Sequence, residues 1–225
     1  LSPARTPIEL RVGTDALTVA VSASNDFVTS LTRAQLAAIF SGAATTWDQV
    51  DPSFPAEPIQ TFSPGSDSGT FDYFLEETLE ADVEDGGLGL EGEAAEAAIQ
   101  SVPGIQFSED DNVLVQGIEG SPYAIGYFGY AYYLENQDRL TAVAIEGVVP
   151  TVAAVDAGEY LFARPLFVYA DAGIIAAKPQ VGEFMSYYLS NDAEFVAQVG
   201  YFQAPERAIR LSKLLLMIAM SDAMM

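Results

Sequence analysis

Hydrophobic positions in the first part of the chain follow two different periods. In residues 16–21 a large aliphatic side chain recurs at every second position, which predicts a β-strand. Residues 30–42 place apolar side chains three or four positions apart, which predicts an amphipathic helix. Ser30 or Thr32 is suited to cap the start of this helix, and Gly42 is suited to end it.

A second strand and helix flank a segment rich in glycine and hydroxyl side chains. Residues 58–62 predict a short strand, and the sequence SPGSDSGTFDYF at 63–74 follows directly. Near the end of that segment, Phe71, Phe74 and Leu75 return to helical spacing. We therefore predict a strand, a loop and a helix in that order.

Strands and helices continue to alternate along the rest of the chain. The patterns predict loops at 45–55 and 80–93, helices at 94–100, 108–120, 178–191 and 192–202, strands at 140–145 and 165–170, and a strand passing into a helix over 123–133. This alternation indicates the α/β fold class.

The composition removes several classes of function. The 225 residues include no cysteine and no histidine, which excludes disulfides, thiolate metal sites, a cysteine nucleophile and a Ser-His-Asp triad. The formal net charge is −23, from 32 acidic and nine basic residues, and such a surface repels nucleic acid and anionic lipid. We expect no catalysis, no cofactor and no nucleic-acid partner. The acidity fits either a high-salt habitat or an ordinary soluble acidic protein.

The ends of the chain carry no recognisable targeting signal. The sequence does not begin with methionine and shows no signal peptide. The apolar run LLLMIAM at 214–220 is far too short to span a bilayer. We expect it to form a helix that docks on the body or to remain a separate tail.

The loop at residues 63–70 has the pattern of an oxyanion site and of a capped helix. A helix N-terminus presents unpaired backbone N–H groups and a positive dipole end. Ser66, Ser68 and Thr70 add hydroxyl donors to the N–H groups of Gly69 and Thr70, so that a tetrahedral oxyanion is surrounded without any lysine. The local sequence is equally typical of a well-capped helix after a tight turn.

Asp67 lies within this loop, and its charge restricts which anion the loop accepts. A carboxylate repels a neighbouring anion by roughly a few kcal/mol in a partly buried site. The repulsion is relieved when the anion has a proton to donate, as hydrogen phosphate has at neutral pH and sulfate has not. Asp67 is therefore a candidate for selecting phosphate over sulfate, and capping of the helix is the alternative role.

Other motifs indicate no further chemistry. The loop is not a P-loop, because no lysine follows its second glycine, and it is not a nucleophile elbow, because Asp67 replaces the serine. The acidic sequences EADVEDGG and SEDDN lack the spacing of an EF-hand, so we expect solvated surface and no metal site. Arg164 is a candidate for reaching an anion, although pairing with one of the many carboxylates is favoured.

Five segments, in order, resemble one known family. PGSDSGTFDYF, with LTRAQLAAIFSGAATTWDQV, SEDDNVLVQGIEG, AIGYFGYAYY and RPLFVY, resembles the phosphate-binding subunits of high-affinity phosphate ABC transporters. The resemblance implies a type II periplasmic-binding-protein fold, in which two hinged α/β lobes hold phosphate between them. It further implies that Ser68, Gly69 and Thr70 donate to phosphate. A periplasmic or extracellular monomer that delivers phosphate to a membrane permease is implied as well.

The chain departs from this family in two respects. Many members carry an arginine four residues before the serine, where this chain has Pro64. The glycine–serine–serine–threonine loop and the later aspartate–serine segment of the family's first lobe are not found here. We therefore expect an incomplete first lobe, and weak or no phosphate binding by this chain alone.

The resemblance also divides the chain into parts. Residues 1–16 are expected to be an N-terminal remnant of the first lobe, 17–130 the second lobe with the anion loop, 131–205 the return to the first lobe, and 206–225 a C-terminal tail. Two alternatives to phosphate import stay open. One is a binder of another oxyanion such as sulfate or molybdate, and the other is an inactive remnant that serves only as an interaction module.

Overall fold

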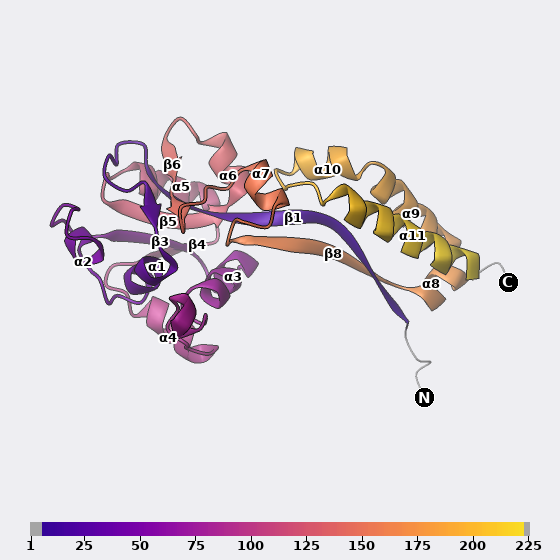
Figure 1. Ribbon diagram of the computed structural model, residues 1–225, viewed down its shortest axis with the longest axis horizontal. Helices are drawn as coiled ribbons and strands as arrows, with labels where there is room; N and C mark the ends of the chain where they lie inside the picture. Colours follow the sequence, from indigo (N-terminus) through magenta and orange to yellow (C-terminus); the bar gives the residue numbers. More distant parts are fainter. Residues whose placement is uncertain (1–5, 223–225) are drawn as a thin grey trace. The chain divides into compact units, whose positions relative to one another are not determined.

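The computed structural model describes residues 6–222, and the chain divides into two compact units (Figure 1). Unit 2 is the continuous segment Ala16–Phe162, whereas unit 1 combines Leu1–Asp15 with Ala163–Met225. The chain passes from unit 1 to unit 2 within strand β1, Pro7–Ser22. The mixture of helices and strands confirms the predicted α/β class.

A mixed sheet forms the centre of unit 2. Its strands lie in the order β4 (Gln106–Ser108), β3 (Gln60–Pro64), β5 (Ala124–Gly129), β1 and β6 (Leu140–Ala142). β3 is parallel to β4 and β5, whereas β1 is antiparallel to β5 and β6. The carboxyl ends of the three parallel strands therefore lie at the same edge of the sheet. A separate pair of parallel strands is formed by β2 (Ser30–Leu31) and β7 (Ala144–Ile145).

Short helices connect these strands. They are α1 (Arg33–Phe40), α2 (Trp47–Val50), α3 (Gly69–Glu77), the 3-10 turn η1 (Val83–Asp85), α4 (Glu93–Gln100), α5 (Asp111–Glu119), α6 (Tyr130–Glu135) and α7 (Val152–Asp156). Thr32 caps α1 as predicted, because its side chain accepts the N–H of Gln35 at 3.2 Å. Gly42 follows α1 at a φ of 76°, a left-handed conformation that favours glycine.

Aromatic side chains fill the core of unit 2. Trp47, Phe74 and Tyr127 are completely buried, and the rings of Phe74 and Tyr127 stack with centroids 3.8 Å apart. Two glycines make room for Phe62: a methyl group at Gly117 would lie 2.1 Å from its ring. At Gly126 a methyl group would lie 2.8 Å from the backbone oxygen of the same phenylalanine. This close approach explains why the segments at 108–120 and 123–133 carry glycine inside regular elements.

Unit 1 consists mainly of helices. After β8 (Ala163–Asp171), which pairs with β1, the chain forms α8 (Ala172–Ala177), α9 (Pro179–Ser190), α10 (Asp192–Gln198) and α11 (Glu206–Asp222). α11 packs against α8 and α9, and Figure 1 shows α9 and α11 side by side. The core of this unit is aliphatic and includes Leu10, Met185, Leu189 and Leu216. No residue of β8 is fully buried.

Several boundaries differ from the sequence-based expectations. β1 begins at Pro7 rather than at residue 16, because its first part pairs with β8, far along the chain. Unit 2 extends to Phe162 rather than to residue 130, because β6 and β7 pair with β1 and β2. The loop expected at 45–55 contains the four-residue helix α2.

The C-terminal segment docks on unit 1. The expected tail at 206–225 forms α11, with Leu216 and Ala219 buried against the aliphatic core, so it is not a separate tail. Residues 1–5 and 223–225 of the expected terminal parts lie outside the described residues. Among the helices within 6–222, none has the length and hydropathy needed to cross a bilayer.

Candidate anion-binding site

The predicted strand, loop and helix at residues 58–79 are present as β3, a tight turn and α3. The N–H of Ser68 donates to the carbonyl of Gly65 at 3.0 Å and closes the turn between them. The Oγ of Ser68 then accepts the N–H of Thr70 at 3.2 Å, so Ser68 is the N-cap residue of α3. The capped-helix interpretation of this segment is therefore correct. The N-terminal end of α3 faces the loop that precedes it.

The five predicted ligand residues all lie on this turn, with different exposure. Ser66, Asp67 and Gly69 are exposed, and Ser68 and Thr70 are half-buried. Asp67 does not take the capping role considered for it, because Ser68 occupies that position. The turn therefore presents a carboxylate and hydroxyl groups to solvent at one helix end.

The turn lies at the carboxyl edge of the parallel strands. The register pairs Ser63 with Phe107 and Pro64 with Ser108, so the loop after β4 runs next to the loop after β3. Glu109, from the β4 loop, places its carboxylate against Gly65: a methyl group on that glycine would lie 1.7 Å from Oε1. Sequence reasoning did not identify Glu109 as a site residue, because it assigned SEDDN to solvated surface. Its position depends on a strand register that spacing alone does not reveal.

Open pockets flank the turn on an acidic surface. One pocket of about 320 Å³ is lined by Ser66, Phe71, Leu75 and Gly92 and by five carboxylates, those of Asp72, Glu76, Glu80, Glu93 and Glu96. Another, of about 290 Å³, is lined by Gly65, Ser66, Phe71, Gln100, Phe107 and Glu109. Within residues 6–222, no group of three or more acidic side chains has an arrangement suited to hold a metal ion.

Cationic side chains of unit 2 are engaged elsewhere. The unit contains no lysine, and Arg33 and Arg139 form ion pairs with Glu77 and Glu119 at 3.5 and 2.7 Å. Arg164, in unit 1, pairs with Asp15 at 3.2 Å, which confirms the favoured alternative for that residue. Both arginines of unit 2 are therefore paired with carboxylates away from the turn.

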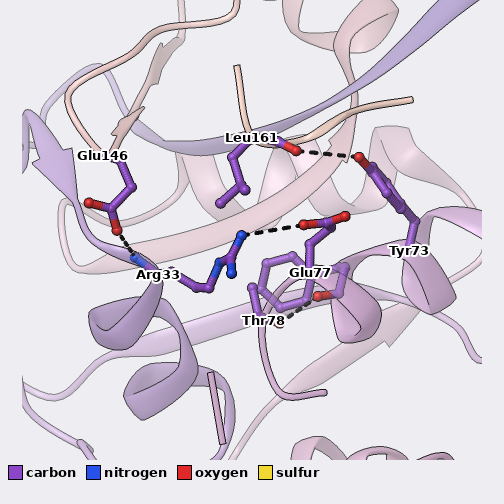
Figure 2. Close-up of polar contacts among 7 residues, drawn as sticks. Arg33, Tyr73, Glu77, Thr78, Glu146 and Leu161 are labelled. Carbon is purple, nitrogen blue, oxygen red and sulfur yellow. Dashed lines mark hydrogen bonds and ion pairs between the residues drawn. The ribbon is translucent and has the colours of Figure 1, made fainter. Parts of the chain in front are cut away.

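Polar contacts hold the far end of α3 (Figure 2). The guanidinium of Arg33 reaches Glu77, and Tyr73 donates its hydroxyl proton to the carbonyl of Leu161 at 3.4 Å. The backbone N–H of Arg33 donates to the Glu146 carboxylate at 2.7 Å. Burial raises the pKa of Glu77, and the charge of Arg33 partly offsets that rise. These contacts fix the orientation of the helix whose other end carries the turn.

The backbone of Glu146 adopts an uncommon conformation. Its φ is 51° and that of Gly147 is 80°, which makes a tight turn between β7 and Val148. A left-handed φ is disfavoured for a residue with a side chain. The hydrogen bond from α1 to the Glu146 carboxylate helps to hold this residue in place.

The sequence has clear relatives. It matches the PBP superfamily domain over residues 2–192. Protein SphX of Synechocystis sp. is 38% identical over 216 residues, which cover 92% of this chain and 60% of the relative. Phosphate-binding protein PstS of Staphylococcus haemolyticus is 34% identical over 207 residues, with 90% and 60% covered. The chain thus spans about 60% of the length of these curated relatives.

Solved structures of phosphate-binding proteins also resemble this chain. A structure described as a possible phosphate binding protein from Planctomyces limnophilus is 34% identical, with a TM-score of 0.76, and the match covers 96% of this chain and 73% of that one. An ABC-type phosphate transport receptor from Vibrio cholerae is 22% identical with a TM-score of 0.69, covering 88% and 73%, and shows similarity of fold alone. The predicted resemblance and the type II periplasmic-binding-protein fold are confirmed.

Proposed function

The chain belongs to the PBP superfamily, and on this premise we propose that it captures inorganic phosphate for import by an ABC transporter. The relatives named for phosphate binding support the choice of ligand. Because the chain spans only part of the length of its curated relatives, phosphate capture, the permease partner, a monomeric state and a periplasmic or extracellular location are all parts of the proposal.

The observation that carries the proposal is the turn between β3 and α3. It lies at the carboxyl ends of parallel strands, where ligands bind in open α/β sheets. The N-terminus of α3 directs the positive end of its dipole to the turn, and Ser66, Ser68 and Thr70 add hydroxyl groups. We propose these residues, with Asp67 and Gly69, as the phosphate contacts that unit 2 supplies.

The charges near the turn favour an anion that carries a proton. Asp67 lies on the turn and the Glu109 carboxylate lies against Gly65, while both arginines of unit 2 are paired with other carboxylates. A fully deprotonated anion such as sulfate meets uncompensated negative charge there. Hydrogen phosphate is able to donate its proton to a carboxylate, so this surface favours phosphate over the alternative oxyanions.

Thermal unfolding with millimolar phosphate, with sulfate and with neither tests the ligand. A rise in the melting temperature with phosphate only would support the proposal, since a ligand stabilises the state that binds it, and would overturn the expectation that this chain alone binds phosphate weakly or not at all. A response to sulfate as large as the response to phosphate would instead favour a general oxyanion binder. No response to either anion would agree with that earlier expectation and would contradict phosphate capture by this chain.

A pair of matched variants tests the location of the site. Ser68→Ala removes the cap of α3, and Thr151→Ala removes the equivalent cap of α7, where the Thr151 hydroxyl accepts the N–H of Ala154 at 3.2 Å. Each is expected to cost about 1 kcal/mol of stability. Only Ser68→Ala should abolish the phosphate response, and equal responses in the two variants would place the ligand elsewhere.

Replacement of Asp67 by asparagine tests selectivity. Asp67→Asn removes the repulsion of a fully ionised anion and supplies an amide donor, so affinity for sulfate should rise relative to that for phosphate. The same comparison with Glu109→Gln decides which carboxylate sets the preference. An unchanged ratio of sulfate to phosphate affinity in both variants would remove these side chains from the selectivity argument.

A further inference from the structure

A buried tyrosine forms a hydrogen bond with the strand that leads into the turn. Tyr127, on β5, is completely buried, and its hydroxyl lies 2.7 Å from the Oγ of Ser63 on β3. Ser63 is also completely buried, and its Oγ donates to the carbonyl oxygen of Pro64 at 2.9 Å. Pro64 is the last residue of β3, immediately before the turn at Gly65. The two hydroxyls therefore connect the middle of the sheet to the last residue of β3, which leads into the turn.

The direction of this hydrogen-bond chain follows from counting protons. The Ser63 hydroxyl has one proton, and that proton is directed to the Pro64 carbonyl. Tyr127 must then be the donor in its contact with Ser63. Burial raises the pKa of Tyr127, so the phenol keeps its proton throughout the physiological range. The chain runs from Tyr127 through Ser63 to Pro64.

The ring of the same tyrosine holds the other side of the turn. It stacks on Phe74 of α3 with an interplanar angle of 13°, and it meets the ring of Phe40 edge-on at 5.4 Å. Phe74 is itself completely buried, one and a half turns into the helix that Ser68 caps. The hydroxyl of Tyr127 thus contacts β3, the strand that leads into the turn. Its ring contacts α3, the helix that follows the turn.

We propose that Tyr127, acting through Ser63, is a positioning residue of the anion-binding turn, which it holds in register with the N-terminus of α3. The proposal rests on the proposed function, because it assigns a role in the same site. Backbone N–H groups and hydroxyls are dipoles, and their attraction for an anion depends on orientation more strongly than that of a point charge. A site without a cation from its own unit therefore needs a rigid support for the turn.

Tyrosine-to-phenylalanine variants test this role, because they keep the ring and remove only the hydroxyl. Tyr127→Phe breaks the chain to Pro64. Tyr160→Phe is the matched control, since Tyr160 is also buried in unit 2, and its hydroxyl donates to the carbonyl of Leu17 at 2.9 Å, on β1. Ser63→Ala removes the middle hydroxyl of the chain.

The first measurement is hydrogen exchange of the Ser68 and Thr70 amides without phosphate, by nuclear magnetic resonance. Both amides are hydrogen-bonded within the turn. Tyr127→Phe and Ser63→Ala should accelerate their exchange about three- to tenfold, the factor that corresponds to one neutral hydrogen bond. The Tyr160→Phe control should leave both rates unchanged, although it lowers the global stability by a similar amount.

The second measurement is phosphate affinity, by titration of the same variants. Tyr127→Phe and Ser63→Ala should weaken phosphate binding by a similar factor, and Tyr160→Phe should not. If Tyr127→Phe and Tyr160→Phe behave alike in both measurements, the positioning role is overturned. If the unaltered chain does not respond to phosphate, the proposed function fails, and the exchange rates of the two amides alone decide whether Tyr127 holds the turn.

Discussion

Unit 2 and unit 1 bury their aromatic residues to very different extents. In unit 2, Phe40, Phe74, Tyr127 and Phe162 are completely buried and contact one another. Of the eight aromatic residues of unit 1, only Phe202 is buried. The share of aromatic residues in the sequence is similar in both units, so composition does not separate them. The difference lies in whether each helix face has a partner within the described chain.

The exposed side chains of unit 1 gather on its helices. Phe184 and Tyr187 on α9 are 63% and 62% exposed, and on α11 the exposed fractions are 56% for Leu211, 52% for Leu214 and 65% for Met217. Exposed apolar side chains at these positions are available for contact with another surface. The stability of unit 2 should therefore depend on its own core, and the behaviour of unit 1 on what its surface contacts.

The largest expected effect comes from the aromatic core of unit 2. Phe74→Ala removes a completely buried ring between Phe40 and Tyr127, and should cost about 3–5 kcal/mol of unfolding free energy. Chemical denaturation followed by the fluorescence of Trp47, the only tryptophan, measures unit 2 directly. Phe184→Ala in unit 1 should change stability by about 0.5 kcal/mol or less, because that ring is exposed. Equal costs would remove the distinction between the two units.

A smaller effect is expected where glycine admits the ring of Phe62. Gly117→Ala adds a methyl group that would lie 2.1 Å from that ring, and should destabilise unit 2 by about 1–3 kcal/mol. The sign is informative, because alanine in a helix is otherwise favoured over glycine by about 1 kcal/mol. Gly129→Ala is the control, since a methyl group there meets open space. Stabilisation by Gly117→Ala, measured by the same fluorescence, would show that the ring moves freely.

Local signals in the sequence were sufficient to predict several helices and strands. The helix starting after Thr32 and the helix capped by Ser68 were predicted from periodicity and candidate capping residues, and the strand that passes into a helix over 123–133 was predicted from its apolar pattern alone. These features depend on neighbours within a few positions, so one sequence is enough to find them. The resemblance then supplied the fold.

Features that depend on distant pairing were not predictable in this way. The first part of β1 is set by β8, and the end of unit 2 by the pairing of β6 and β7. Helices α2, α7 and α8 have four to six residues, too few to be stable without tertiary packing. In the candidate site, the turn itself was predicted. Glu109 and Tyr127 reach it only through strand register, and no local pattern marks that contact.

The pH dependence of unit 1 offers a further contrast. Asp192 is buried at the start of α10, and its Oδ1 has no hydrogen-bond partner. Burial raises the pKa of this carboxyl, and Lys213 lowers it by less. A raised pKa in the folded state means that folding takes up a proton. The stabilising contribution is thus full below the unfolded pKa of 3.8 and is lost as pH rises through the folded value.

Asp192→Asn should remove this dependence. The variant should be more stable than the unaltered chain near neutral pH, by about 0.5–1 kcal/mol, because no buried charge remains. Circular dichroism, which reports the helices of both units, measures unfolding across the acidic to neutral range. Glu183→Gln, at an exposed position of α9, is the control and should keep the pH dependence. A variant that keeps the same slope as the unaltered chain would contradict the assignment to Asp192.

The smallest effect on stability, and the sharpest contrast between buried and exposed positions, is expected on α11. Leu214→Gln and Met217→Gln change side chains that are more than half exposed, so each should alter the unfolding free energy by about 0.5 kcal/mol or less. Leu216→Ala, two residues from the first and next to the second, removes a side chain that is 2% exposed and should cost about 2–3 kcal/mol.

Self-association should follow the opposite order, since the exposed leucine and methionine are the groups available to another surface. Light scattering of concentrated samples should therefore show less association in Leu214→Gln and Met217→Gln than in the unaltered chain. Unchanged association in both would mean that this face of α11 is solvated as it stands.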